Sequence, residues 1–304
     1  MRTYQPLALP VAGSLFLAVL SGIVVPRTAG AEPISLLGEQ SPAQESSFTL
    51  DFGVFGGRTS ARIAQTQFAL EIDADLGAAR FEDYVQRVEP LTLPGGFNTG
   101  NIRVEIVPGS SDGNFNDLTG EFETDELYAI HFDGDLRAFN LTSPVILPSS
   151  SAGRVTVAAV NGGAVNLAWT GISELVNPFD PSSVIQFSYT CAVEAAFDPD
   201  PTSLVRLALM PDVLNLAAPA WLESQLMGKL TSALHYIETG GYRWAVRALE
   251  TFVARVEAQR GAQLSDEVAD MLTSDAEGAI LLLTSEITGP REFRSPTPLR
   301  LQKD

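Results

Sequence analysis

Residues that could bind a metal ion lie in one short stretch of the chain. Side-chain oxygens stand at positions 1, 3, 5, 6 and 12 of a twelve-residue segment, on Asp112, Asn114, Asn116, Asp117 and Glu123. Hard oxygen ligands at this spacing are typical of an EF-hand-like calcium loop. Position 6 of such a loop is normally glycine and here is Asp117, and an Asx-rich turn explains the same residues. The segment therefore predicts either a Ca²⁺ site or an ordinary turn.

A second group of possible ligands comes shortly afterwards. His131, Asp133 and Asp135 alternate along the chain, and alternate residues of a strand share one face, so together they could hold a transition metal. Gly134 interrupts the strand pattern, and a solvated strand end explains these residues equally well. The other histidine, His235, is expected to be a surface or half-buried side chain of a helix.

Catalytic chemistry finds little support in the residue types. Cys191 is the sole cysteine and falls on the inward side of an alternating apolar run, so we expect a buried, protonated thiol. With two histidines in the chain, a serine-hydrolase triad would depend on His131, which makes that class a poor fit. Carboxylates are abundant around residues 121–126, so the acid count cannot test a glycosidase. We predict no catalytic and no cofactor-binding residue.

Residues 46–200 have the pattern of an all-β domain. Apolar residues alternate with polar ones, most clearly in the run Ile185, Phe187, Tyr189, Cys191 and Val193. Turn residues separate these runs, and Asn161-Gly162 is typical of a tight hairpin. We expect an antiparallel β-sandwich of jelly-roll or immunoglobulin-like type.

Residues 219–284 change to a helical period. Apolar residues recur at steps of three and four in stretches that begin near Trp221, Tyr242 and Ser265. Glycines at 240, 241 and 261 separate the stretches. The short connections predict an antiparallel three-helix bundle. We expect residues 201–218 to form an apolar connector between the two domains.

The bundle also resembles a known family. Its residues include Gly240-Gly241-Tyr242, Phe252-Val253 and Val256-Glu257-Ala258-Gln259, followed by Gly261. This pattern, within residues 219–283, resembles the FIMAH module, a small helical unit appended to the C-terminal end of many secreted bacterial hydrolases. The resemblance implies an accessory role in an exported bacterial protein and assigns no reaction. The β-rich domain resembles no family that we recognise.

The start of the chain has the features of a signal peptide. Arg2 precedes an apolar run that reaches Val25, and Ala29-Gly30-Ala31 supplies small residues for cleavage. The run is about 15 residues, shorter than the ~20 that a membrane-spanning helix needs. We expect residues 1–31 to be removed, which leaves a secreted or periplasmic protein without a membrane anchor. Residues 32–45 and 285–304 are expected to be flexible.

The chain is strongly acidic. It has 37 Asp and Glu against 19 Lys and Arg, a formal net charge of −18, which becomes −20 when Arg2 and Arg27 leave with the signal peptide. Such a surface repels nucleic acid and anionic lipid, so we exclude both as main partners. A single cysteine also excludes an internal disulfide.

Three functions remain open from the sequence. The first is a secreted, non-catalytic protein whose β domain binds a partner or has a structural role, with the helices as an accessory module. The second is a small extracellular hydrolase acting on a polysaccharide or related polymer. The third is a structural surface or matrix component that assembles through sheet edges. An exposed aromatic platform would favour an extracellular glycan or surface polymer as partner, whereas a cleft with two facing carboxylates would favour hydrolysis.

Overall fold

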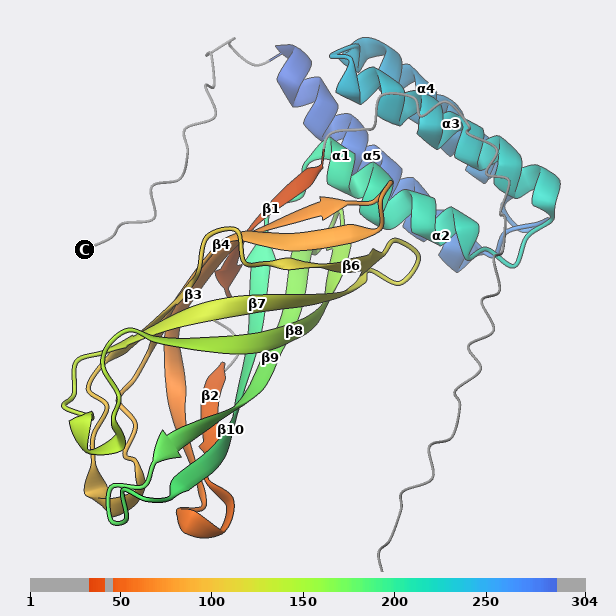
Figure 1. Ribbon diagram of the computed structural model, residues 1–304. Helices are drawn as coiled ribbons and strands as arrows, with labels where there is room; N and C mark the ends of the chain where they lie inside the picture. The colour runs from red at the N-terminus through yellow and green to blue at the C-terminus, as the bar shows by residue number, and fades with distance from the viewer. Residues whose placement is uncertain (1–32, 42–45, 289–304) are drawn as a thin grey trace, which may run out of the picture. The chain divides into compact units, whose positions relative to one another are not determined.

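The computed structural model describes residues 33–41 and 46–288, an antiparallel β-sheet followed by helices (Figure 1). This confirms the expected order of an all-β part and an all-α part. The expected signal peptide, and the chain from residue 289 onward, lie outside the described residues.

The strands occupy the first two thirds of the described chain. Their bounds are β1 (Ile34–Gln40), β2 (Ser47–Asp51), β3 (Arg58–Asp73), β4 (Ala78–Val88), β5 (Ile102–Ile106), β6 (Asp112–Asn116), β7 (Glu121–Phe132), β8 (Val145–Ala158), β9 (Gly162–Val176) and β10 (Val184–Phe197). Short 3₁₀ turns occur at η1 (Gly53–Phe55), η2 (Pro94–Gly96) and η3 (Arg137–Phe139).

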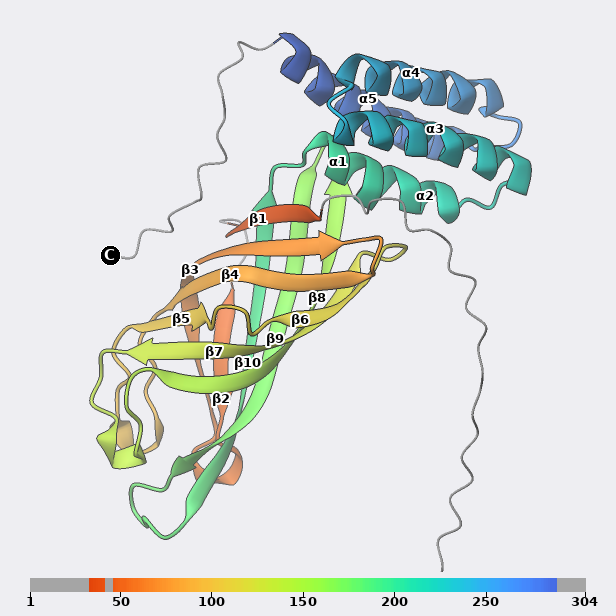
Figure 2. The same ribbon diagram turned by 45° about the horizontal axis from the view of Figure 1, so that its top comes forward.

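All of these strands belong to one hydrogen-bonded sheet that closes on itself. The sheet runs from β3 through β2, β10, β9, β8, β7 and β5 to β4, and β4 pairs again with β3. Irregular pairing of β3 with β4 at Ile63/Gln65 and at Ala69/Leu70 bends these long strands, as β-bulges do. Two faces of the sheet thus lie opposite each other across one core, as the layers of a sandwich do, with hydrogen bonding continuous between them (Figures 1 and 2).

The N-terminal strand corrects one expectation. Residues 32–45 were expected to be flexible, but residues 34–40 form β1, which pairs with β3 and with the end of β10. Ile34 and Leu36 are buried in the core. A Cβ at Gly38 would come within 2.4 Å of the Phe68 ring, so glycine lets β1 lie directly over that ring. The two buried apolar side chains stabilise an ordered strand here.

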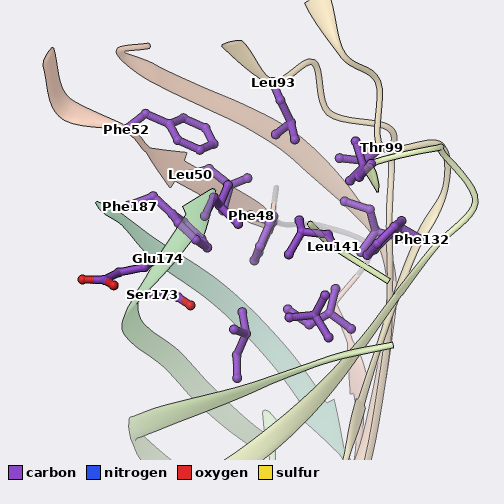
Figure 3. Close-up of a pocket in the computed structure, with 16 residues that line it drawn as sticks. Phe48, Leu50, Phe52, Leu93, Thr99, Phe132, Leu141, Ser173, Glu174 and Phe187 are labelled. Carbon is purple, nitrogen blue, oxygen red and sulfur yellow. The ribbon is translucent and has the colours of Figure 1, made fainter. Parts of the chain in front are cut away.

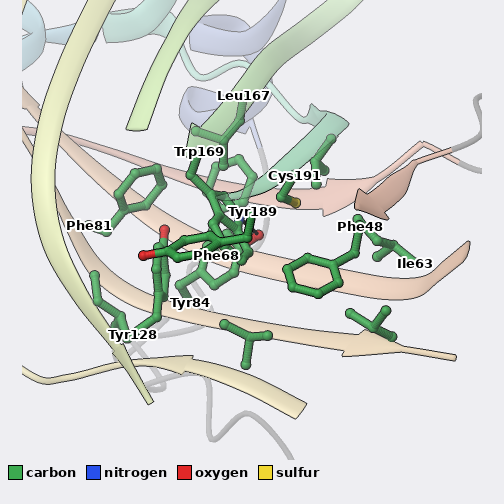
Figure 4. Packing of buried hydrophobic residues seen from close by; sticks show 14 of the residues in the cluster. Phe48, Ile63, Phe68, Phe81, Tyr84, Tyr128, Leu167, Trp169, Tyr189 and Cys191 are labelled. Carbon is green, nitrogen blue, oxygen red and sulfur yellow. Dashed lines mark hydrogen bonds between the residues drawn. The ribbon is translucent and has the colours of Figure 1, made fainter. Parts of the chain in front are cut away.

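The core holds the inward side chains of the alternating runs (Figure 4). Trp169 is fully buried at its centre, with its ring 4.8 Å from that of Tyr128 and 5.8 Å from that of Tyr189. Its indole N–H donates to the hydroxyl of Tyr84 at 3.1 Å, so the buried polar edge is satisfied. Gly171 leaves room for Tyr189, whose hydroxyl would lie 2.1 Å from a Cβ there.

The helices begin directly after β10. The Asp200 carboxylate accepts the backbone N–H of Ser203 at 2.7 Å and starts a helical segment made of α1 (Pro201–Ser203), η4 (Leu204–Leu209) and α2 (Met210–Leu214). The expected connector is therefore largely helical. The bundle helices follow as α3 (Ala220–Glu238), α4 (Tyr242–Gln259) and α5 (Asp266–Thr288). None of the helices in the described part of the chain is long and apolar enough to cross a membrane.

The first helical segment joins the core of the bundle and also contacts the sheet. Leu204 and Leu209 are buried together with the inner stripes of α3, α4 and α5. Arg206 of the same segment forms an ion pair with Asp75 at 2.6 Å. From α5, the Asp275 carboxylate accepts the backbone N–H of Ala159 at 2.8 Å. The helical segment that follows β10 therefore packs in the core of the bundle and also contacts the sheet.

Candidate functional site

An apolar pocket of about 90 Å³ lies inside one end of the closed sheet (Figure 3). Alternation along β2 turns Phe48 and Leu50 inward, and β10 contributes Phe187. The loops that precede β5 and follow β7 add Leu93 and Leu141. For comparison, an engineered apolar cavity of ~150 Å³ holds benzene, so this pocket suits a smaller apolar group.

The few polar side chains at the pocket either lie at its rim or form hydrogen bonds that hold its wall in place. Thr99 accepts the backbone N–H of Leu91 at 2.8 Å and donates to the carbonyl of Gly100 at 2.9 Å, so its hydroxyl fixes the loop. Ser173 and Glu174 line the pocket from β9, and the Glu174 carboxylate points away from the apolar side chains in Figure 3. The pocket can therefore bind an apolar group without placing a charge against it.

Exposed apolar side chains stand on the turns at the same end of the sheet. Val54 and Phe55 lie in the turn that follows Phe52 of the pocket wall, and Phe179 follows Leu175 of the wall. Glycine allows neighbouring turns to meet, because a Cβ at residue 95 would lie 2.7 Å from the Phe179 ring. Apolar surface thus continues from the pocket to the tips of its bordering turns.

A buried carboxylic acid lies deeper in the sheet. Glu126 on β7 is 3% exposed and points into the core, where the Ser151 hydroxyl donates to Oε1. Its Oε2 atom and the buried Thr124 hydroxyl have no hydrogen-bond partner among the described residues. Burial raises the pKa of Glu126 to about 7, although the hydrogen bond from the Ser151 hydroxyl acts in the opposite direction. The carboxyl is therefore predominantly protonated in mildly acidic solution.

The residues of the predicted calcium site lie on the β6–β7 hairpin. Asn114 stands opposite Glu123, and Asp112 stands opposite Asp125, all exposed along one shallow surface groove. The Asn116 Oδ1 atom instead accepts the backbone N–H groups of Leu118 and Thr119, at 3.0 and 3.3 Å.

The hairpin thus separates the predicted ligands into two groups. Asp112, Asn114 and Glu123 lie along the strands, whereas Asn116 organises the turn that contains Asp117. Across residues 33–41 and 46–288, no three His, Cys, Asp or Glu side chains form a group that could hold a metal ion. Calcium binding stays a prediction.

The alternative ligand group around His131 is divided among separate partners. His131 Nε2 lies 3.3 Å from an Oε atom of Glu105. Asp133 accepts from the side-chain amide of Asn101 at 3.2 Å, and Asp135 lies 3.5 Å from Arg137. Each side chain therefore has a neighbour that explains it without a shared metal.

The possible nucleophiles also have structural partners. Cys191 is buried beside Gln86, and burial raises the pKa of its thiol to about 12. Residues 109–113 spell the Gly-x-Ser-x-Gly pattern of a nucleophile elbow, which joins a strand to a helix in hydrolases. Here the segment joins two strands, and the Ser111 hydroxyl accepts the backbone N–H of Phe81 at 2.9 Å.

Comparison with known proteins identifies the helices. The family model of the FIMAH domain matches residues 218–280. This range covers α3, α4 and most of α5, and it confirms the resemblance found in the sequence. No curated protein matches the chain. The matched range does not include the closed sheet or its pocket.

Sequence patterns did not reveal the pocket or the buried acid. The pocket depends on which strands face one another across the core, and a single strand's alternation does not specify that. Glu126 could have been found, because it lies in phase with Phe122, Thr124 and Tyr128 on the inward side of one strand. A carboxylate in phase with such a run is a signal for a buried acid.

Proposed function

We propose that the chain is an exported, non-catalytic binding protein in which the closed sheet binds an apolar group of its partner and the FIMAH domain is an accessory. The observation that supports this most is the pocket, whose walls include Phe48, Leu50 and Phe187 and which continues to exposed apolar turns. Concave, mostly apolar sites of this kind are the usual place for ligands.

The partner that we propose is an extracellular glycan or a related surface polymer bearing an apolar substituent. A pocket of about 90 Å³ suits one short alkyl or small ring group rather than a whole polymer unit. The substituent would enter the pocket, and the exposed Val54, Phe55 and Phe179 would contact the surface around it. The sequence features of residues 1–31 support export, and an N-terminus at Glu32 in the exported protein would test it.

The two other functions receive less support. A glycosidase needs two carboxylates that face one substrate, and the pocket wall contributes one, Glu174, which points outward. Asp112 and Asp125 do stand opposite each other on the β6–β7 hairpin, but both are exposed in a surface groove. Assembly through sheet edges is disfavoured because the strands close on themselves, and an edge is what such assembly requires. Binding therefore remains the function that we propose.

The test is a titration of the mature protein with n-alkanols of increasing length, followed by NMR. Each added methylene contributes about 0.8 kcal/mol while it enters an apolar site, which is roughly a fourfold gain in affinity. We expect the gain to stop once the pocket is full. Chemical shifts should change around Phe48 and Phe187 and leave the helices unaffected.

A pair of valine substitutions provides the control. Val145 lines the pocket, and Val145→Phe should fill it and abolish alkanol binding. Val160 is 80% exposed in the β8–β9 turn, so Val160→Phe should leave binding unchanged. If the affinity for alkanols keeps rising with chain length, equally in both variants and without a plateau, the binding is non-specific and the proposal is contradicted.

A further inference from the structure

An exposed aromatic pair stands at the corner where α3 meets α4. Trp244 in the first turn of α4 is 56% exposed, and its ring lies 6.4 Å from that of Tyr236 in the last turn of α3, with 34° between the planes. Gly240 and Gly241 make the turn, and a Cβ at Gly241 would come within 3.3 Å of the Tyr236 ring. The glycines thus keep space beside a tilted apolar surface that faces solvent.

Hydrogen-bonding groups surround this aromatic surface. In the described part of the chain, neither the indole N–H of Trp244 nor the hydroxyl of Tyr236 has a hydrogen-bond partner. His235 is exposed beside them, with its ring 5.6 Å from that of Tyr236. A ligand at the corner would therefore meet both apolar ring faces and free polar groups.

Two arginines give the corner a positive charge. Arg247 follows Trp244 by three residues and Arg243 by four, so helix geometry makes Arg247 a surface neighbour of both the indole and Arg243. Both are exposed, and neither forms an ion pair within the described residues. The first turn of α4 contains no acidic residue, and the exposed Glu238 ends α3, so the two arginines outnumber the one acid at this corner. This positive charge contrasts with the net charge of −18 of the chain.

We propose that the α3–α4 corner, formed by Tyr236, Arg243, Trp244 and Arg247, binds a polysaccharide that carries carboxylate groups. The apolar face of a sugar ring would stack on the two aromatic rings, and its hydroxyls would meet the free N–H and O–H groups. A guanidinium binds a carboxylate through two parallel hydrogen bonds, which matches a uronate. This inference rests on the proposed function in one respect, because both take a glycan polymer as the partner.

Single-stranded nucleic acid is the competing ligand for this corner. Bases also stack on aromatic side chains, so stacking alone does not distinguish the two. A nucleic acid carries a phosphate at every nucleotide and is repelled by the acidic sheet domain. An oligogalacturonate carries a charge on every residue as well and meets the same repulsion, which physiological salt screens beyond about 8 Å, so direct comparison with single-stranded DNA decides between the two ligands.

The test is calorimetric titration of the mature protein with oligogalacturonate and with its methyl-esterified form, which keeps the rings and removes the charge. Trp244→Ala should weaken binding of both at least tenfold, because both stack. The double change Arg243→Gln with Arg247→Gln should weaken oligogalacturonate binding at least tenfold and leave the esterified form within twofold. Added salt should weaken binding of the charged form.

Two control variants and a competing polymer decide the outcome. Trp221 is 48% exposed at the other end of α3, and Arg255 is exposed on α4 about 12 Å from Arg247, so Trp221→Ala and Arg255→Gln should leave both affinities unchanged. Absence of binding, equal losses in the controls, or equally tight binding of single-stranded DNA would overturn the proposal. Alkanol binding in the sheet pocket is independent of Trp244, so the two proposals can fail separately.

Discussion

Glu126 is an ionisable residue in a buried environment that disfavours its charged form. Its carboxyl is buried among hydroxyls with no cation beside it among the described residues, and burial raises its pKa to about 7. In the unfolded chain a glutamate titrates near 4.3. Between these two values the folded protein holds a proton that the unfolded chain releases, so the free energy of unfolding falls as pH rises.

The expected loss is about 3 kcal/mol between pH 4.5 and pH 7. Glu126→Gln should remove this contribution, so that the variant gains stability relative to the wild type as pH rises through that window. Urea unfolding at several pH values measures the difference. Glu121→Gln, an exposed change on the same strand, should follow the wild type. If the free energy of unfolding depends on pH in the same way for Glu126→Gln and for the wild type, the Glu126 carboxyl is solvated and this account is wrong.

Substitutions in the β6–β7 hairpin can distinguish an ordinary turn from a Ca²⁺ site. The Asn116 side chain accepts two backbone N–H groups of the turn, so Asn116→Ala should cost about 1 kcal/mol with calcium or with a chelator. If Asp112 and Glu123 bind Ca²⁺, then Asp112→Ala should lose a calcium-specific gain in melting temperature at matched ionic strength. Identical melting temperatures of the wild type in calcium and in chelator would rule out the metal and leave the turn.

Among the elements, the strands and helices differ in how much the sequence predicted. Runs with regular alternation, such as Ile185 to Val193, were predicted with the correct inward residues. The strand β4 was not identified, because a bulge between Phe81 and Tyr84 breaks its alternation. Strand β1 was missed because it is short and has glycine at one inward position, Gly38. Helical periods are longer and more redundant, so α3, α4 and α5 were found.

Phe252 should be the main anchor of α4. Its side chain is fully buried between the bundle helices, so Phe252→Ala should cost about 3–5 kcal/mol in the free energy of unfolding of the helical part. Trp244→Ala on the same helix removes a larger but half-exposed ring and should cost far less. Circular dichroism during urea unfolding measures both variants, and equal losses would show that Phe252 is not packed as described.

The helical segment before α3 should be part of the folding unit. Leu204, Val205 and Leu209 are buried in the same core as the bundle helices. A fragment of residues 201–288 should therefore be helical and unfold cooperatively, whereas residues 213–288 should be less stable because that apolar surface is lost. Equal melting temperatures for the two fragments would show that residues 201–212 belong with the sheet.

At the scale of the whole molecule, the sheet domain carries both most of the acidic residues and the apolar pocket. The acidic residues are concentrated on the sheet domain, while its apolar pocket and exposed Val54, Phe55 and Phe179 lie at one end. Composition indicated an acidic chain, residues 1–31 predicted export, and the resemblance to the FIMAH module implied a helical accessory. It could not indicate the pocket, because Phe48, Leu93 and Phe187 come from distant parts of the sequence and meet when the sheet closes.

The central claim is that the closed sheet contains an apolar site ready to receive a ligand. The most direct measurement is a crystal structure of the mature protein under xenon pressure, since xenon enters dry apolar cavities. The account predicts a xenon atom among Phe48, Leu50 and Phe187 in the wild type and its loss in Val145→Phe. No xenon at this end of the sheet, with the pocket filled by side chains, would contradict it.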